Sequence, residues 1–227
     1  MLLALNVNTI IRIVSLAVFT LAGGLLWLVD PHAAEGLWGL KGAVLGAPTL
    51  IIFLLTIRPI FRWVHGASFA RVWLFPLLDG EWEGEVHSNW PRIEAMMIAA
   101  RDDGPRFNAM SDELPQQPPI PISAKIVSGL FDYRIVLRMS DTRWSYTVFV
   151  KPVWCKPDLP RLYYVYRQQE DGQVVVTDRQ QHTGAAYLDF HADAETLAGA
   201  YWTERQSELG LNTAGRIRLR RKKPGAS

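Results

Sequence analysis

The distribution of apolar residues divides the chain into an apolar beginning and an alternating remainder. Residues 13–29 carry no charged side chain, and neither do residues 42–57. A helix of about 20 residues crosses the roughly 30 Å hydrocarbon core of a bilayer, and charged side chains at its ends can reach the headgroups. The pattern therefore predicts two transmembrane helices, over about residues 12–30 and 38–58, which form a hairpin in residues 1–60.

Charged residues around the two spans predict their orientation. Arg12 precedes the first span, and Arg58, Arg62 and Arg71 follow the second, whereas the loop of residues 30–41 is on balance acidic. Because basic residues collect on the cytoplasmic side, this asymmetry places both termini in the cytoplasm. The chain is then a two-span protein of a bacterial inner membrane, with its remaining residues cytoplasmic.

A cleaved signal peptide is the alternative interpretation of the first span. Ala33 and Ala34 are small residues of the kind found at cleavage sites. The region before the span has only the late Arg12, however, and signal peptides normally begin with a basic segment. The membrane hairpin is therefore preferred.

Small residues inside the two spans are candidate helix-packing positions. Gly42 and Gly46 have small-xxx-small spacing, and Gly23 and Gly24 adjoin one another in the first span. Such positions let helix backbones approach closely. They can serve packing within the hairpin or assembly between protomers.

Residues 61–78 connect the hairpin to the remainder of the chain. Aromatic residues alternate here with Arg62, His65 and Arg71. This composition is typical of a segment that lies along anionic lipid headgroups. We therefore expect an interfacial connector.

From residue 79 to residue 223 short runs of alternating apolar and polar residues are separated by turn residues, as in antiparallel strands. Residues 91–101 are apolar without alternation and predict a short helix, and the Pro-rich residues 101–121 predict a long loop. About eight strands without crossover helices favour a closed, lipocalin-like β-barrel, which can enclose one small ligand. The alternating runs are residues 80–88, 120–129, 133–139, 143–153, 162–167, 184–191, 196–205 and 215–221.

One face of these predicted strands is rich in aromatic residues, most of which we expect to be core. Arg205 also falls on this face, and a charge in an apolar interior is costly unless an acid or an anionic ligand pairs with it. The face comprises Trp82, Tyr133, Trp144, Tyr146, Tyr164, Tyr166, Tyr201, Thr203 and Arg205, with the aliphatic Ile126, Ile135, Val148, Leu188 and Ile217.

Composition and charge add little to this picture except at the end of the chain. The 227 residues are 49% apolar and have a net charge of +2, which predicts no particular partner. The basic residues 216–223 can form an exterior strand face or a patch that holds the barrel against anionic lipid. DNA or RNA binding would require a broader basic surface with a recognisable reading element.

Motifs for catalysis or metal binding are not apparent. The single cysteine, Cys155, suits a reducing compartment, and the five histidines show no ligand spacing. Glu81, Glu83 and Glu85 alternate on one strand face, where a solvated exterior explains them better than acid–base chemistry. We expect no metal, no catalytic residue and no cofactor, although an enzyme that uses Cys155 or His182 remains a further alternative.

Several motifs in order give the chain a resemblance to a known family. They are Gly-Glu-Trp-Glu-Gly at 80–84 with Ser-Asn-Trp at 88–90, Leu-Tyr-Tyr-Val-Tyr at 162–166, His-Thr-Gly-Ala-Ala-Tyr-Leu at 182–188, Leu-Ala-Gly-Ala-Tyr-Trp-Thr-Glu-Arg at 197–205 and Gly-Arg-Ile-Arg-Leu at 215–219. With the two-helix start, they resemble the SMODS-associating, two-transmembrane, β-strand-rich effectors of CBASS antiphage systems. The long insertion at residues 101–121 and Arg-Trp-Ser at 143–145 depart from that pattern.

The resemblance implies a receptor and an effector in one chain. In such a protein the barrel binds a cyclic dinucleotide made by a partner nucleotidyltransferase, and the bound protomers oligomerise. The clustered helices then disrupt the inner membrane, which causes growth arrest or cell death.

Phosphates call for arginine and bases call for aromatic faces, so the inward face supplies the candidate contacts. A membrane-tethered, lipocalin-like carrier of an apolar ligand is the alternative, suggested by Gly80-x-Trp82 at the start of the barrel. The candidate ligand-binding residues are Trp82, Trp144, Tyr164, Tyr166, Tyr201, Thr203 and Arg205, with His182 and Arg134 as second choices. His182 is also explained as a hydrogen-bonded residue of a turn.

Overall fold

The computed structural model describes residues 50–51, 53–67, 75–101, 103–114, 117–129, 133–156, 159–172 and 179–223. The first predicted span and most of the second, including Gly23, Gly24, Gly42 and Gly46, lie outside the described residues. No helix among the described residues is both long enough and apolar enough to cross a membrane.

The chain divides into two compact units, and the smaller one contains helix α3, Arg58–Gly66. Pro59 lies in the first turn, where its missing N–H leaves no hydrogen bond unmade. Phe61 and His65 are buried on one side, and the His65 imidazole forms a hydrogen bond of 3.0 Å with the carbonyl oxygen of Phe75. Trp63 is 80% exposed, so the helix has a buried and an exposed aromatic side.

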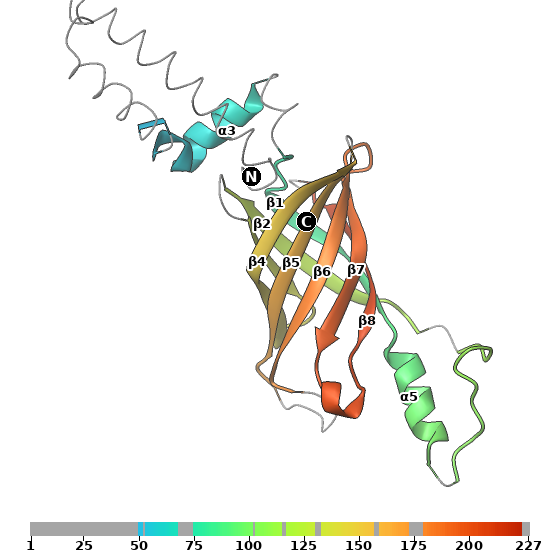
Figure 1. Cartoon of the computed structure of the whole chain (residues 1–227). Helices are drawn as coiled ribbons and strands as arrows, with labels where there is room; N and C mark the ends of the chain where they lie inside the picture. The colour runs from blue at the N-terminus through green and yellow to red at the C-terminus, as the bar shows by residue number, and fades with distance from the viewer. Residues whose placement is uncertain are drawn as a thin grey trace, which may run out of the picture. The chain divides into compact units, whose positions relative to one another are not determined.

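The larger unit is a closed antiparallel barrel of eight strands, which confirms the predicted barrel (Figure 1). Each strand pairs with the next in the sequence, and β8 returns to pair with β1. Closure leaves no unpaired edge strand in the barrel. The strands are β1 Gly80–Ser88, β2 Ile120–Ser128, β3 Tyr133–Arg138, β4 Arg143–Lys156, β5 Leu159–Glu170, β6 Gln181–His191, β7 Thr196–Glu204 and β8 Ala214–Arg221.

Helix α5, Trp90–Ala99, follows β1 directly, close to the predicted helix of residues 91–101. Asn89 joins this point to β8, because its amide donates to the Ala214 carbonyl at 2.9 Å and its side-chain oxygen accepts from the Ala214 amide at 2.8 Å. The end of β1 and the start of β8 are thereby held together.

Large side chains fill the barrel interior near the start of β1. Trp82 is 1% exposed and packs edge-to-face on Phe190, with 6.3 Å between the ring centroids. Its indole N–H donates to the Leu78 carbonyl oxygen at 3.0 Å. Leu197 and Leu219 are fully buried in the same barrel. This part of the interior is therefore a packed core.

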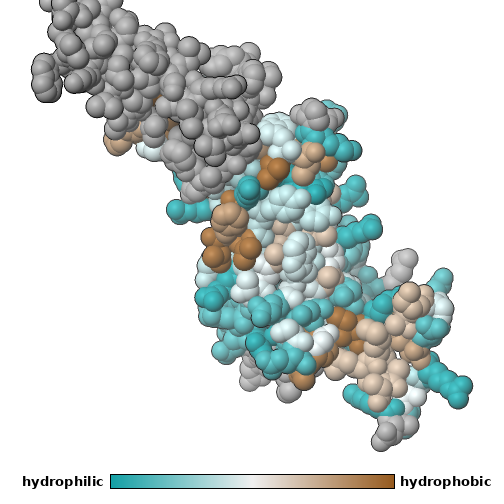
Figure 2. Space-filling model, in the orientation of Figure 1, coloured by the Kyte–Doolittle hydropathy of each residue, from teal (hydrophilic) through white to brown (hydrophobic). Residues whose placement is uncertain are grey.

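Charged residues cover the outside of the seam where β8 closes on β1. The pairing places Glu83 opposite Arg220 and Glu85 opposite Arg218, and both arginines are exposed. Opposite charges at directly paired positions stabilise a sheet. Arg216, Arg218 and Arg220 of β8 thus lie on an exterior strand face, as one of the two interpretations of the sequence predicts. On the side of the molecule that Figure 2 shows, the barrel surface is mostly hydrophilic or neutral with a few apolar patches.

The predicted inward face is wrong for the first half of β4. Directly paired residues project from the same side of a sheet, and Trp144 pairs with the exposed Arg138, whereas Ser145 pairs with the buried Leu137. Trp144, Tyr146 and Val148 therefore point outwards, and Val148 is 65% exposed. The pairing with β5 shifts between Thr147 and Phe149, and beyond this irregularity the buried positions are the even-numbered Val150 and Pro152.

Candidate functional site

A cavity of about 340 Å³ opens into the barrel at the end where β1, β3, β5 and β7 finish. Its volume is near the lower end of the range of roughly 300–1,000 Å³ that is usual for small-molecule sites. Val86, Leu137 and Ile217 form apolar parts of its wall, and Trp90 of α5 and Pro118 lie at its margin. The barrel thus has a filled end and an end that can receive a ligand.

Three tyrosines of β5 and β7 form the aromatic wall of the cavity. Tyr164 and Tyr166 of β5 lie with their ring centroids 5.9 Å apart, and Tyr201 belongs to β7. Gly184 makes room for the Tyr166 ring, since a Cβ at that position would lie only 2.3 Å from the ring carbon Cζ. The absence of a side chain on Gly184 is therefore what admits this ring to the interior.

Burial makes ionisation of these three phenols even less favourable than in water. It raises the pKa of Tyr164 and of Tyr201, and it also raises the pKa of Tyr166, to which the neighbouring Tyr164 and Tyr201 contribute further. The positive charge of Arg205 opposes part of the pKa shift of Tyr166 and Tyr201. At neutral pH the cavity consequently presents hydroxyl donors and uncharged aromatic faces.

Two arginines reach the cavity from strand ends. Arg143 begins β4, and its guanidinium forms an ion pair with the Glu170 carboxylate at the end of β5. Arg205 follows the last residue of β7, and its backbone amide donates to the Asn212 side-chain oxygen at 3.1 Å. Both arginines therefore lie at the mouth beside apolar and aromatic walls, and the charge of Arg143 is paired with Glu170.

Polar side chains without charge complete the lining. The hydroxyls of Thr203 and Thr213 lie 2.9 Å apart, and the Thr203 hydroxyl also accepts from the Thr213 backbone N–H at 3.1 Å, which ties β7 to the segment before β8. Ser145 and Gln168 face the cavity from β4 and β5 and are 6% and 3% exposed. The site thus combines cationic, aromatic and hydrogen-bonding groups.

The structure brings five of the predicted ligand-binding residues together at this cavity. Tyr164, Tyr166, Tyr201, Thr203 and Arg205 all line it. Their odd–even alternation along β5 and β7 was sufficient to place them on the inward face. Only Arg205 lies beyond its strand, and it still borders the cavity.

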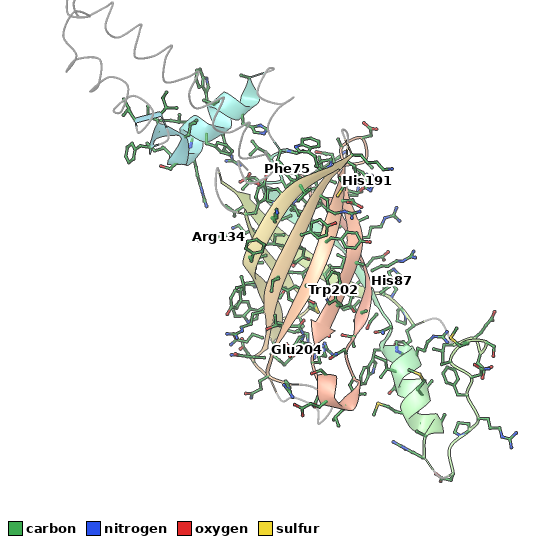
Figure 3. The ribbon with its side chains drawn as sticks, in the orientation of Figure 1. Phe75, His87, Arg134, His191, Trp202 and Glu204 are labelled. Carbon is green, nitrogen blue, oxygen red and sulfur yellow. The ribbon has the colours of Figure 1, made fainter. Side chains whose placement is uncertain are left out.

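The other predicted residues lie elsewhere. Trp82 is buried in the packed core, and Trp144 is on the outer face, where its indole N–H donates to the Asp171 carboxylate at 3.1 Å. Arg134 is exposed on the outside of the barrel (Figure 3). His182 is buried on the inward face of β6, opposite Gln168, but it does not line the cavity.

Sequence reasoning did not identify Arg143, Ser145 and Gln168 as site residues. Arg143 and Ser145 were missed because a single alternation over residues 143–153 places Trp144 and Tyr146 inwards, whereas the pairing of β4 shifts between Thr147 and Phe149. Gln168 was missed because β5 continues to Glu170, beyond the predicted end at residue 167. Leu162, Tyr164 and Tyr166 alternate along the inward face, and one more step of this alternation leads to Gln168.

Within the described part of the chain, no group of three His, Cys, Asp or Glu side chains could hold a metal ion. Cys155 is exposed and lies near the end of β4, away from the residues that line the cavity. The donor groups at the cavity are arginine, amide and hydroxyl groups, which suit anions and planar polar ligands better than cations.

No protein-family model matches this chain, and no curated protein sequence matches it significantly.

Proposed function

We propose that this protein is a membrane-anchored effector of a CBASS antiphage system, and that its barrel is the receptor for a cyclic dinucleotide. The observation that carries the proposal is that two arginines and three tyrosines line the same cavity. They are Arg143, Arg205, Tyr164, Tyr166 and Tyr201. A cyclic dinucleotide has two phosphates and two planar bases, and these groups favour arginine and aromatic partners respectively. The site therefore offers the chemistry that such a ligand requires.

The membrane part of the proposal depends on the sequence. Residues 12–30 and 38–58 have the length and composition of membrane spans, and α3 adds an exposed Trp63 beside Arg62 next to the second span. In this proposal the spans anchor the chain in a bacterial inner membrane with the barrel in the cytoplasm. A partner nucleotidyltransferase supplies the ligand.

Ligand binding would act on the membrane through assembly. If the assembled form binds ligand more tightly than the single protomer does, ligand shifts the population towards the assembly. Clustered spans then disturb the bilayer, and the infected cell stops growing. The protein performs no catalytic step in this scheme.

Thermal denaturation of the full-length protein in detergent, with and without a panel of cyclic dinucleotides, tests the receptor function. A ligand present at a hundredfold excess over its Kd stabilises the folded state by about 2.7 kcal/mol, which raises Tm measurably. Arg205→Ala should abolish the shift while the variant remains folded. Arg134→Ala is the matched control, because Arg134 is also an arginine of the barrel but lies on its outer face.

The outcomes separate the possible functions. A shift with one cyclic dinucleotide that Arg205→Ala loses and Arg134→Ala keeps supports the receptor. A full panel without any shift contradicts it.

A carrier of an apolar ligand is the second candidate, and one observation favours it. Val86, Leu137 and Ile217 give the cavity an apolar wall. The packed core around Trp82 closes the opposite end of the barrel. In the same experiment, stabilisation by fatty acids and not by cyclic dinucleotides would favour the carrier.

A further inference from the structure

An inward-facing polar row crosses three strands beside the cavity. Gln168 of β5 is directly opposite Ser145 of β4 on one side and His182 of β6 on the other. Side chains at directly paired positions lie on the same face, with Cβ atoms about 4.5–5.5 Å apart. Ser145 and Gln168 both line the cavity.

Gln168 is the central member of this row and is only 3% exposed. The residue lines the cavity, so its carboxamide can meet water or a ligand there. A buried amide needs hydrogen-bond partners, and water in the cavity or a bound ligand can supply them. A ligand that displaces this water without replacing its bonds loses affinity.

A carboxamide is planar and presents one acceptor and two donor hydrogens side by side. Its complement is a planar edge with a neighbouring donor and acceptor, as when a glutamine bonds to N6 and N7 of adenine in a nucleic acid. Nucleobases have such edges, whereas the acyl chain of a lipid has none. Tyr166 lies two residues before Gln168 on the same face of β5 and offers its ring to a neighbouring base.

We propose that Gln168 determines base specificity in this receptor, by pairing with the hydrogen-bonding edge of one base of the cyclic dinucleotide. The cavity of about 340 Å³ is small for a binding site, so one base enters it while the phosphates remain at the mouth near Arg143 and Arg205. The inference rests on the proposed receptor function. It adds that the arginines supply affinity for any cyclic dinucleotide and that Gln168 discriminates among them.

The test compares full-length wild type with Gln168→Leu by measuring Kd for cyclic dinucleotides that carry adenine, guanine or uracil. The leucine side chain has a similar volume but no polar group. Gln168→Leu should weaken binding of the preferred ligand by roughly 5- to 150-fold, which is the discrimination expected of a bidentate base contact. It should leave the poorer ligands nearly unchanged, so that the preference among bases disappears.

A structural role for Gln168 predicts a different result in the ligand-free protein. If the carboxamide held the barrel together, Gln168→Leu would lower Tm without ligand. In our proposal Tm without ligand changes little, because the carboxamide bonds to water in the cavity and not to another part of the barrel. Retained base preference in Gln168→Leu, or a marked fall in its ligand-free Tm, would overturn the inference.

Gln168→Glu provides a second and more specific outcome. A carboxylate only accepts hydrogen bonds, so it should favour guanine, which presents two adjacent donors, over bases that present a donor beside an acceptor. A shift of the base preference towards guanine supports the inference, and an unchanged preference contradicts it. If the wild type binds no cyclic dinucleotide at all, the receptor function itself fails, and that result is distinct from binding without base discrimination.

Discussion

The guanidinium of Arg221 lies over the ring of Trp82, with its carbon Cζ 4.6 Å from the ring centroid. Arg221 also donates to the backbone carbonyl oxygens of Asp79 and Leu77, the latter at 3.2 Å. Since Trp82 is in β1 and Arg221 is in β8, this contact joins the first and last strands. It fixes the seam where the barrel closes and also fills one end of the interior.

Loss of the Trp82 ring should strongly destabilise the barrel. The ring is 1% exposed, so Trp82→Ala leaves a large cavity and should lower the free energy of unfolding by about 3–5 kcal/mol. Urea denaturation followed by circular dichroism measures this change. Trp144→Ala is the control, because Trp144 lies on the outer face and should cost less than about 1 kcal/mol. Equal losses for the two tryptophans would contradict the assignment of Trp82 to the core.

High pH should destabilise the protein through its buried tyrosines. Burial is the main reason that the pKa of Tyr133, Tyr164, Tyr166 and Tyr201 is raised. An ordinary tyrosine ionises near pH 10, so the unfolded chain releases these protons first as pH rises. Stability from this source is complete below about pH 10 and is lost at higher pH, towards the raised pKa values.

Tyrosinate absorbance and urea denaturation between pH 8 and pH 12 test this expectation. These four phenols should remain un-ionised until the barrel unfolds, and Tyr164→Phe should reduce the fall in stability with pH. Complete ionisation of all tyrosines in a protein that remains folded would show that the phenols are accessible.

Adding one methyl group at Gly184 should distort the cavity wall. A Cβ there would meet the Tyr166 ring at 2.3 Å and the Trp202 carbonyl oxygen at 2.8 Å. Gly184→Ala should therefore destabilise the barrel by about 1–3 kcal/mol, the usual cost of overpacking. Thermal denaturation measures the loss.

A second substitution shows whether the clash is with the tyrosine ring. In the Gly184→Ala, Tyr166→Leu double variant, removal of the ring should recover part of the stability, so that the two effects are not additive. Additive losses would mean that the Tyr166 ring does not occupy the space beside Gly184.

Local alternation was sufficient to predict most of the fold and about half of the site. The pattern of β5 and β6 fixes which residues point inwards, and Tyr164 and Tyr166 were placed correctly for that reason. In β4 the pairing with β5 shifts after Thr147. The inward positions are therefore odd-numbered before the shift and even-numbered after it, so a single alternation cannot describe the whole strand. Trp144 was consequently assigned to the wrong face, and Arg143 was overlooked.

Other features depend on contacts between residues that are far apart in the sequence. The ion pair of Arg143 with Glu170 and the stacking of Arg221 on Trp82 follow from strand register and closure, which alternation within one strand does not specify. The ends of β5 and β6 also extend past their apolar runs, because pairing between the two strands continues through polar residues such as Gln169 and Gln181. The strand ends are where the cavity opens, so these extensions bear directly on the site.

On the outer face, Arg161 and Asp189 should stabilise the pairing of β5 with β6. The two residues are directly opposite, and Arg161 binds the carboxylate through Nε at 2.6 Å and Nη2 at 2.8 Å. The hydrogen bond to Asp189 is the main reason that the pKa of Arg161 is raised, and the guanidinium also lies 4.3 Å from the Tyr187 ring centroid. Arg161→Lys keeps the charge but loses the bidentate hydrogen bonds to Asp189 and the stacking on the Tyr187 ring. It should lower the free energy of unfolding by about 1–2 kcal/mol.

A double-mutant cycle with Arg161→Ala and Asp189→Ala isolates the pair from the loss of the individual side chains. Because both side chains are largely shielded from solvent, 23% and 16% exposed, the coupling should exceed that of a fully exposed ion pair and reach about 1 kcal/mol or more. The coupling should decrease only slightly when salt rises from 0.1 to 1 M, since much of it comes from short hydrogen bonds and not from long-range attraction. A coupling near zero, or one that high salt removes, would mean that the pair is an ordinary surface contact. The pairing of β5 with β6 would then be maintained by its backbone hydrogen bonds and by the inward tyrosines alone.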